Sequence, residues 1–524
     1  MEKNKDFFAL EAGSGLFEAS DSSIGRITQD LSGKTWKMEK MRVGQGVSEG
    51  IHLLKSELSG NNFSWNAAQV PGDVYTDLFL AGELDDPFWG RNMGKAKWVQ
   101  EYEWWYNRAF NVDKNLIGKD IELIFEGVDF SCEVWLNQKY LGRHEGMYSS
   151  FSFQVTDLLD YSQPHVPVNL LTVKLDPPPK NQQNFAGMKH NFSGDYLTGL
   201  IPFGIWQPVK LVATNRLRLE NYRVEYDLHK NAATAVFYIE LSNLSDSVLE
   251  AELNVSMTGR DQQITHSEPL SVSPGTSVCT FSFEIEDPQL WWPYELGEPF
   301  LYDLNILIAD GKSILDSLSD KTGIRTITMQ MNPGFTEEES RIPWTFVING
   351  KPMFLRSACW GGQPSFFYGR NSTPKYRMFL EKAKEANINN LRIFGWHPAE
   401  TDEFYTICDQ LGITVWTNFS FATQEFKTDQ PYIEKVTKEI QSTVIKRRNH
   451  PSNIMWMGGE EVYFTEAHVE SGNKQLMEYI GEVTHQLTNT PYADASPLSS
   501  RKRINACELT LLCCRGNFYG RLLS

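Results

Sequence analysis

Residues 388–418 read INNLRIFGWHPAETDEFYTICDQLGITVWTN, and they combine two short apolar runs with a helical segment between them. The runs, 388–395 and 413–421, have the length and the content of buried strands. The segment between them, 401–412, has apolar residues at helical spacing and ends in Gly412, as helices commonly do before the next strand begins. A strand, a helix and a second strand in this order predict a βαβ unit with parallel strands.

The same alternation continues on both sides of this unit. Strands are predicted at 352–360 and 452–461, and helices at 373–387 and 431–448, the first of which begins with Thr-Pro. Four strands with helices between them predict the opening half of a (β/α)8 barrel, whose active-site residues lie at the carboxyl ends of the strands. A doubly wound sheet would give the same alternation, and periodicity alone does not exclude it.

Up to about residue 325 the pattern is all β. Segments such as IELIFEGVDF (121–130), CEVWLNQKYL (132–141) and VNLLTVKL (168–175) alternate apolar and polar residues, which is the period of half-buried antiparallel strands. A second such stretch begins near residue 216 with RLRLENYRVEYDLH and continues through FYIELSNL (237–244). Two β-sandwiches are therefore predicted before the barrel, the second of them smaller and immunoglobulin-like.

Composition restricts the classes of function. The chain has 524 residues, of which 41% are hydrophobic, and this length predicts about three domains. Its net charge of −17 argues against a nucleic-acid partner. No run of about 18 apolar residues predicts a membrane span. The seven cysteines have neither metal-ligand spacing nor an even disulfide framework, and no Gly-rich phosphate loop predicts a cofactor.

The amino end predicts no secretory signal. Its apolar run is interrupted by Glu11 and Gly13, which leaves the apolar stretch too short. We therefore expect the chain as written to be cytoplasmic, whereas an intact gene product could be secreted, periplasmic or lysosomal.

Two adjacent carboxylates end the predicted fourth strand. Residues 455–464 read MWMGGEEVYF, so that Glu460 and Glu461 follow an apolar run and two glycines. Hydrolysis of a glycosidic bond needs a carboxylic acid that protonates the leaving oxygen and a second carboxylate across the sugar. The alternative is that both acids lie in a solvated turn.

Several segments together resemble glycoside hydrolase family 2, and within it the β-mannosidase branch. They occur in the family's order and span roughly residues 30 to 495. The segments are VPGDVYTDLFLAGELDDPFWGRN, WVQEYEWWYNRAF, FEGVDFSCEVWLNQKYLGRHEGMYSSFSFQV, GIWQPVKL, QLWWPYELGEPFLYDL, GIRTI, FVINGKPMFLRSACW, NINNLRIFGW, FYTICDQLGITVW and RNHPSNIMWMGGEE. The resemblance implies a jelly-roll sugar-binding domain (30–215), an immunoglobulin-like β-sandwich (216–328), and a partial catalytic TIM barrel (342–495).

The resemblance also implies roles for residues in the predicted barrel. Glu461 matches the Glu that acts as general acid and then general base, and Glu460 stands where the family has an Asn that contacts the sugar 2-hydroxyl. Arg392 matches an Arg that supports the nucleophile's carboxylate, with a structural salt bridge as the alternative. Phe394, with Trp396 two residues further on, occupies the place of a sugar-stacking Trp.

Further candidates lie outside these strand ends. Asp195 and Tyr196 fall where mannosidases have a Trp-Asp-Trp run whose Asp binds sugar hydroxyls, and a turn carboxylate is the alternative for Asp195. Trp360, after the first barrel strand, is either a core residue or a sugar platform.

The family's nucleophile is a Glu at the end of the seventh barrel strand. We expect the chain to lack this residue, because after the fourth strand it has one more helix and then an aberrant tail, 496–524, that resembles a shifted reading frame. Glu400 and Glu425 lie near strand ends, but the family gives neither of them this role.

The predicted function is retaining hydrolysis of β-linked mannose from oligosaccharides or glycoconjugates, with a carbohydrate as the partner, no cofactor, and this fragment inactive. The alternatives within the family are an exo-β-glucosaminidase or a β-galactosidase or β-glucuronidase. A carbohydrate-binding fragment without catalysis is the alternative outside the enzymes.

Overall fold

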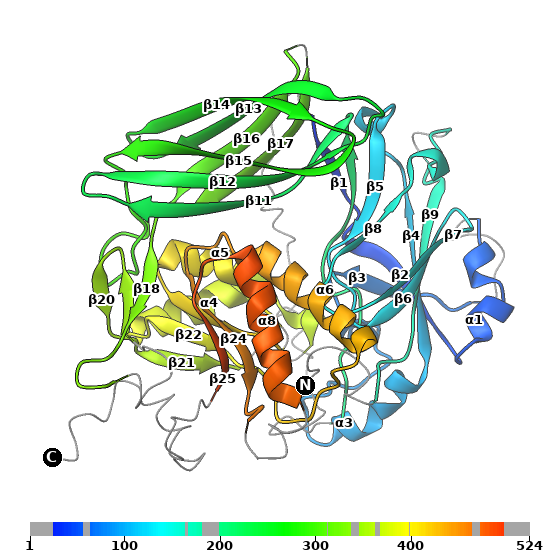
Figure 1. Cartoon of the computed structure of the whole chain (residues 1–524). Coiled ribbons are helices and arrows are strands. Elements are labelled where there is room, and N and C mark those ends of the chain that lie inside the picture. The colour runs from blue at the N-terminus through cyan, green and yellow to red at the C-terminus, as the bar shows by residue number, and fades with distance from the viewer. Residues whose placement is uncertain are drawn as a thin grey trace.

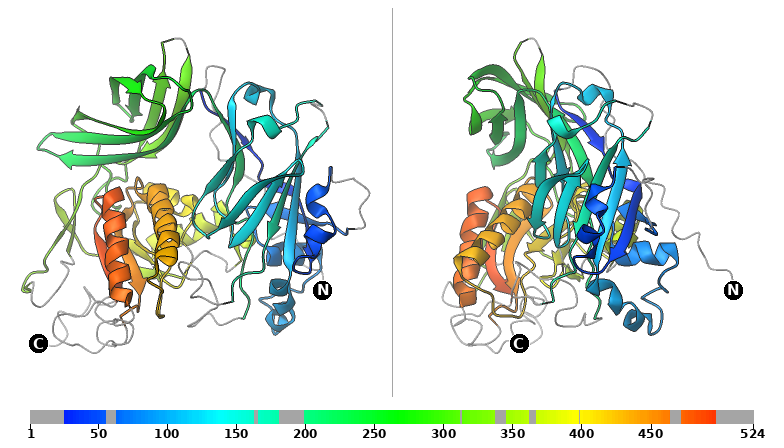
Figure 2. Two further views of the ribbon diagram at one scale, coloured as in Figure 1. Left: turned by 45° about the vertical axis from the view of Figure 1, so that its right-hand side comes forward. Right: turned by 90° about the vertical axis from the view of Figure 1, so that its right-hand side faces the viewer.

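The structure is a computed structural model with three bodies. Figures 1 and 2 show a first β-sandwich beside an α/β body, and a second β-sandwich that lies over the α/β body and meets the first sandwich at one end. The residues that the structure describes are 25–55, 63–162, 166–180, 199–311, 313–336, 345–361, 367–397, 399–463 and 472–496.

The first body is the predicted jelly-roll sandwich of two antiparallel sheets. One sheet has the order β1 (Ile27–Asp30), β10 (Val209–Thr214), β5 (Asp120–Phe125) and β8 (Phe151–Gln154). The other has the order β3 (Asn66–Val70), β2 (Gly33–Met41), β4 (Glu103–Phe110), β9 (Asn169–Leu175), β6 (Ser131–Leu136) and β7 (Lys139–Glu145). Its α-helices are α1 (Gln45–Ser48), α2 (Val74–Ala81) and α3 (Asn92–Lys95). Both sheets supply the core, in which Trp36, Trp104 and Phe125 are buried.

The second body is the predicted immunoglobulin-like sandwich. One of its sheets has the order β11 (Leu217–Leu228), β12 (Ala232–Asn243) and β15 (Gly275–Glu286). The other has the order β14 (Gln263–Val272), β13 (Leu249–Thr258), β16 (Tyr302–Ala309) and β17 (Ile314–Thr322). In β12 every second residue is buried, among them Phe237, Ile239 and Leu241, as the alternating sequence predicts.

A small sheet joins this sandwich to the α/β body. It consists of β18 (Ile327–Gln330), β19 (Thr345–Ile348) and β20 (Lys351–Met353). Because β18 pairs with β19, the segment around residue 328 belongs to this connection and not to the sheets of the second sandwich.

The α/β body is a partial TIM barrel. Its sheet consists of β21 (Ser357–Trp360), β22 (Asn390–Ile393), β23 (Thr414–Asn418), β24 (Asn453–Glu460) and β25 (Tyr492–Ser496), all parallel and in chain order. The connecting helices are α4 (Thr373–Glu385), α5 (Asp402–Leu411), α6 (Gln430–Arg447) and α8 (Lys474–Leu487). Gly412 ends α5 with φ 71°, as predicted.

The fifth strand is a correction, because only one helix and then the tail were expected after the fourth strand. The segment YADAS in β25 has no β-branched residue and carries a central Asp494, so its sequence gives little strand signal. It is a strand because the edge of β24 pairs with it.

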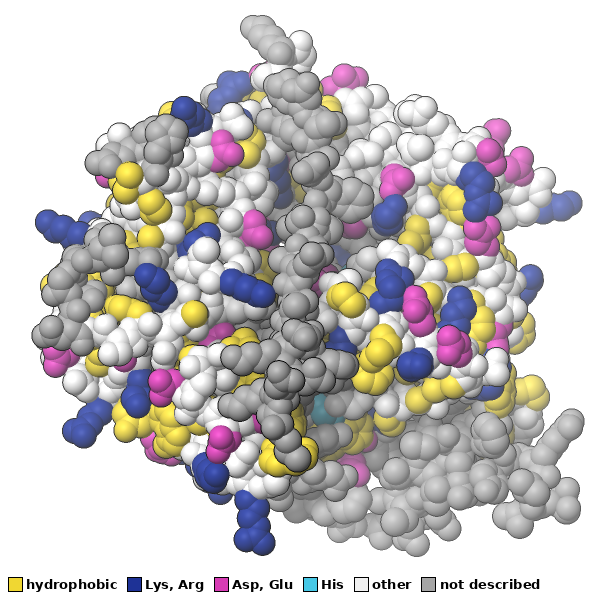
Figure 3. Space-filling model, turned by 180° about the vertical axis from the view of Figure 1, so that it is seen from behind, with side chains coloured by type: hydrophobic (Ala, Val, Ile, Leu, Met, Phe, Trp, Pro, Cys, Tyr) yellow, Lys and Arg dark blue, Asp and Glu magenta, His cyan; other side chains and the backbone are white. Residues whose placement is uncertain are grey.

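The surface shows no segregation of charge on the face seen in Figure 3. Lys and Arg side chains lie among Asp and Glu side chains there. Among the helices that the structure describes, none has the length and apolar character needed to cross a bilayer.

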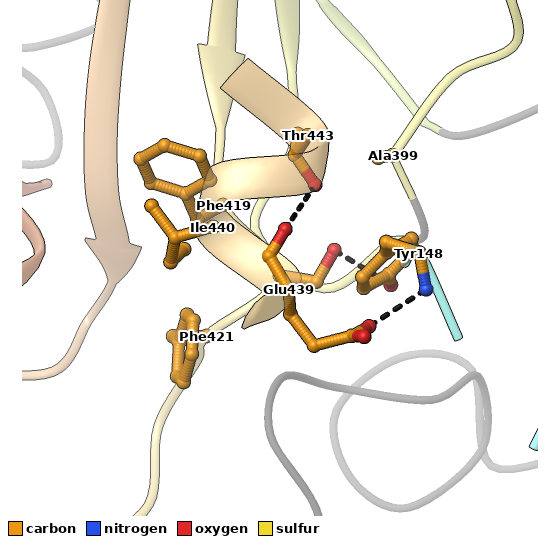
Figure 4. Close-up of a pocket in the computed structure, with 8 residues that line it drawn as sticks. Tyr148, Ala399, Phe419, Phe421, Glu439, Ile440 and Thr443 are labelled. Atoms are coloured by element: carbon orange, nitrogen blue, oxygen red, sulfur yellow. Dashed lines mark hydrogen bonds between the residues drawn. The ribbon is translucent and has the colours of Figure 1, made fainter. Parts of the chain in front are cut away.

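A buried carboxylate joins the first sandwich to the barrel. Glu439 of α6 accepts hydrogen bonds from the backbone N–H groups of Met147, Tyr148 and Ser149 at 2.9, 2.6 and 3.1 Å, and from the Ser149 hydroxyl. Figure 4 shows the bond between the Tyr148 N–H and Glu439. The Tyr148 hydroxyl donates to Ser420 Oγ at 2.9 Å. We call these contacts the Glu439 clamp. Successive N–H groups directed at one carboxylate form an anion-binding nest.

Gly146 allows the Glu439 clamp to close. It has φ 145°, and a Cβ atom at this position would collide with a carboxylate oxygen of Glu439. We expect Gly146→Ala to lower the free energy of unfolding by about 2 kcal/mol more than Gly275→Ala does, because a buried carboxylate loses its donors. Gly275 also has a positive φ, 88°, but nothing lies within 4 Å of its Cβ position. Urea denaturation measures both variants, and equal losses would contradict a role for the clamp in joining the domains.

Candidate active site

Three polar side chains meet where neighbouring barrel strands end. Arg392 of β22, Asn418 of β23 and Glu460 of β24 are 7%, 1% and 5% exposed. Arg392 Nη2 donates to Glu460 Oε2 in a short ion pair, and Arg392 Nε lies 3.3 Å from Asn418 Oδ1. With its amide rotated, Asn418 accepts from Arg392 Nη2 instead, so it contacts Arg392 in either orientation. The carboxyl ends of parallel strands thus form one polar cluster, as the barrel fold predicts.

Close packing requires glycine at the two positions before Glu460 and Glu461. A Cβ atom on Gly458 would lie 2.2 Å from the Asp494 carbonyl oxygen, and one on Gly459 would lie 2.7 Å from a Val462 methyl carbon. Both positions are therefore too close to neighbouring segments for a side chain. This spacing lets the end of β24 pack beside β25.

Glu461 follows β24 directly, at the predicted end of the fourth strand. It has φ 53°, a conformation that non-glycine residues rarely adopt and that is frequent at functional sites. Its backbone N–H donates to the Ser496 carbonyl at 2.5 Å, so the missed fifth strand fixes the turn. The side chain of Glu461 is half-buried.

Two candidate aromatic residues lie near Arg392. The rings of Phe394 and Trp396 are stacked at 18° with their centroids 6.3 Å apart, and both side chains are half-buried. The Arg392 guanidinium carbon lies 5.9 Å from the Phe394 centroid. The structure therefore brings Phe394 to the Arg392–Glu460 pair and Trp396 beside Phe394.

Trp360 makes contacts of another kind. Its ring lies 5.1 Å from Phe404 of α5, and its Nε1 donates to Glu400 at 2.7 Å. It packs with Leu391 and Ile393 against the helices. Because side chains alternate between the two faces of a strand, these residues lie on the opposite side of the sheet from Arg392. These contacts are those of a core residue, and a role in binding sugar stays a prediction.

Asp195 and Tyr196 lie outside the described residues. The chain after them returns beside the connection between β21 and α4, where the rings of Trp206 and Tyr368 are 5.4 Å apart. This connection is fixed to the first sandwich by hydrogen bonds from the Tyr368 hydroxyl to Asp129 and from the Gly369 N–H to Asp73, both 2.8 Å long.

The two other acids near strand ends have different surroundings. Glu400 is completely buried and its carboxyl binds Trp360 and Tyr376. Glu425 is exposed. In the part of the chain that the structure describes, no group of three or more His, Cys, Asp or Glu side chains is arranged to hold a metal ion.

Neither Asn418 nor the Tyr148–Ser420 contact was predicted from the sequence. Asn418 and Glu460 are the last residues of their strands and Arg392 is the last but one of its strand, and this shared position is a signal in the sequence. No local pattern links Tyr148 to Ser420, because 272 positions separate them in the chain.

Three family models match the chain in succession. They are described as the glycosyl hydrolase 2 galactose-binding domain-like domain (residues 50–207), glycosyl hydrolases family 2 (217–325), and the glycosyl hydrolases family 2 TIM barrel domain (345–484). The order of domains and the fold agree with these models. The chain belongs to glycosyl hydrolase family 2.

Within this family the chain is similar to β-mannosidases. Beta-mannosidase B of Emericella nidulans is 28% identical over 439 residues, which cover 80% of this chain and 50% of that protein. Beta-mannosidase of Rattus norvegicus is 27% identical, with 77% and 48% covered. The crystal structure of a beta-D-mannosidase from Dictyoglomus thermophilum superposes with a TM-score of 0.76 at 27% identity, and the match covers 91% of this chain and 58% of that one. The chain thus spans about half the length of these relatives.

The Arg392–Glu460 pair can be tested as a unit. We expect Arg392→Met to lower the free energy of unfolding by roughly 3–5 kcal/mol, because it leaves the buried Glu460 carboxylate without its partner. The double variant Arg392→Met, Glu460→Gln should lose much less of the free energy of unfolding, since no uncompensated charge remains. Urea denaturation of the two single variants and the double variant gives the coupling energy. Additive losses would contradict the pairing.

Proposed function

We propose that this chain is the amino-terminal part of a retaining β-mannosidase, which releases β-linked mannose from oligosaccharides or glycoconjugates. The observation that carries the proposal is the place of Glu461, directly past β24 at the edge where Arg392, Asn418 and Glu460 meet. The similarity to β-mannosidases over about four fifths of the chain supports the choice of sugar.

Glu461 is the proposed general acid and base. In the first step its carboxyl protonates the oxygen of the leaving group, and in the second step its carboxylate activates water. The hydrogen bond from its N–H to the Ser496 carbonyl keeps the backbone of the turn in place. The aromatic pair of Phe394 and Trp396 is proposed to contact the sugar ring, as aromatic faces do with the C–H groups of sugars.

Glu460 stands where the family has an Asn, and its charge is compensated by Arg392. A carboxylate accepts a hydrogen bond from a sugar hydroxyl but donates none when ionised, unlike an amide. We propose that Glu460 contacts the sugar 2-hydroxyl in this way, while Arg392 orients it. Asp195 and Tyr196 are proposed to approach the sugar from the first domain, since the chain that follows them lies beside the β21–α4 connection. A contact between Trp360 and the sugar stays a prediction, because the observed contacts of Trp360 are with Glu400 and Phe404.

The nucleophile is the second carboxylate that a retaining mechanism requires, about 5–5.5 Å from the first. Among the described acids near strand ends, Glu400 is sealed in the barrel wall and Glu460 is bound to Arg392. The family places the nucleophile on a seventh strand. We propose that this residue does not come from the five strands described here.

The role of Glu461 predicts a dependence on the leaving group. In the chain completed with the second half of a related barrel, Glu461→Ala should slow hydrolysis of a mannobioside by about 10²–10⁴-fold. Dinitrophenyl β-mannoside needs little protonation, so its glycosylation step should slow far less, and azide should restore turnover. Glu425→Ala, which removes an exposed acid, is the matched control. Equal losses on both substrates would exclude the acid role.

We expect the 524-residue chain alone to hydrolyse β-mannosides slowly. We expect it to hydrolyse dinitrophenyl β-mannoside at a small fraction of the rate of the completed protein, because the proposed nucleophile does not come from the five strands described here. The completed protein should prefer the β-mannoside over the corresponding β-glucosaminide, β-galactoside and β-glucuronide. Release of dinitrophenol measures all four reactions. Robust turnover by the short chain that disappears in Glu461→Ala would show that the nucleophile lies within it.

A further inference from the structure

Glu400 is a carboxylic acid enclosed in the wall of the barrel. It lies in the connection between β22 and α5, and its exposure is 0%. Trp360 Nε1 donates to Glu400 Oε1 at 2.7 Å, and the Tyr376 hydroxyl donates to Oε2 at 2.8 Å. The N–H of Thr401 lies 3.3 Å from the same Oε2 atom. Buried carboxylates are usually paired with a cation, whereas these three donors are neutral.

The surroundings of Glu400 disfavour its charge. Burial raises the pKa of Glu400 to about 7, although its hydrogen bonds and the positive charge of Arg447 favour the ionised form. Arg447 itself pairs with Asp402 and donates Nη2 to the Glu400 carbonyl at 2.8 Å. The titratable and charged groups that face this cluster are Tyr376 of α4, Arg447 of α6, and Asp402, Glu403, Tyr405 and Cys408 of α5.

Glu400 ends the segment 394–400, which carries both aromatic residues of the candidate site and of which the structure describes residues 394–397, 399 and 400. The segment begins at Phe394, whose N–H donates to the Trp360 carbonyl at 3.3 Å. In its middle the His397 carbonyl accepts a hydrogen bond from Ser420 Oγ at 2.5 Å. Its far end is held by the contacts of Glu400. Trp360 therefore touches both ends of the segment, one through its backbone and the other through its indole.

The proton on Glu400 changes these contacts. In the ionised form both oxygens accept, and the bonds from Trp360 and Tyr376 are strengthened by the charge. In the neutral form one oxygen carries a hydrogen and must donate it. Among Trp360, Tyr376 and the Thr401 N–H, only the Tyr376 hydroxyl can accept it. Protonation therefore reverses the bond to Tyr376 and weakens the bond from Trp360.

We propose that Glu400 is a positioning residue for the sugar-binding segment: gain or loss of its proton changes how the Trp360 indole and the end of segment 394–400 are held, and so moves Trp396. The consequence for sugar binding rests on the proposed function. The movement of Trp396 does not depend on the proposed function.

Fluorine NMR of the chain labelled with fluorotryptophan tests this inference. Trp360→Phe and Trp396→Phe assign the two resonances, which are followed from about pH 5 to about pH 9. We expect both to shift together with a midpoint at about pH 7. Glu400→Gln should hold both near their low-pH positions throughout, because the Gln amide accepts from Trp360 and donates to Tyr376, as the protonated acid does.

The matched control is Glu403→Gln. Glu403 is an exposed acid in the first turn of α5, so this variant removes one negative charge nearby and should leave both titrations in place. If Glu400→Gln does not fold, Tyr376→Phe serves instead. It removes a donor that favours the ionised carboxylate, and it should move the shared midpoint to higher pH.

Two results would overturn the inference. A Trp396 resonance that stays fixed while Trp360 titrates would restrict Glu400 to a local structural role. Titration that persists in Glu400→Gln would assign it to another group, such as His450, whose ring stacks on Tyr405. Addition of an aryl β-mannoside tests the proposed function separately: paired titration without any response to the sugar would keep the inference and count against the β-mannosidase proposal.

Discussion

The buried ion pair of Arg392 and Glu460 is the contact on which the barrel edge depends. Removing two charges from water costs several kcal/mol per ion, so the pair is stable only with good geometry and further hydrogen bonds. Asn418 lies between the two and contacts Arg392. The backbone of Glu460 is bound as well, because its N–H donates to the Phe421 carbonyl and its carbonyl accepts from the Thr423 N–H. The ends of three strands are therefore fixed together.

The first sandwich is part of the same arrangement. Through the Glu439 clamp its loop at Met147–Ser149 binds α6, and the Tyr148 hydroxyl reaches Ser420. Ser420 in turn donates to the His397 carbonyl in segment 394–400. A continuous set of hydrogen bonds thus runs from the jelly roll to the segment that carries Phe394 and Trp396. A small cavity of about 10 Å³ lies at this junction, which is close to the smallest volume that admits one water molecule. It is lined by Tyr148, Ala399, Phe419, Ser420, Phe421, Glu439, Ile440 and Thr443 (Figure 4).

Sequence patterns predicted the elements whose signals are local. The alternation in β12 and the helix end at Gly412 were both confirmed, since each depends on a few consecutive residues. β25 was missed because Tyr492–Ser496 has the composition of a connection and becomes a strand only through pairing with β24. The predicted partner of Arg392 was the nucleophile's carboxylate, whereas in the described residues its carboxylate partner is Glu460.

By itself the sequence determined that two β-sandwiches precede a body of alternating strands and helices, that the strands of this body are parallel, and that Glu460 and Glu461 lie at the end of a strand. Each of these follows from periodicity and turn chemistry within about ten residues. Only the tertiary structure decided that Arg392 pairs with Glu460, 68 positions away, and that Glu439 binds backbone groups 290 to 292 positions away. Such contacts depend on strand register and on how whole sheets pack, and neither is encoded in a local pattern of residues.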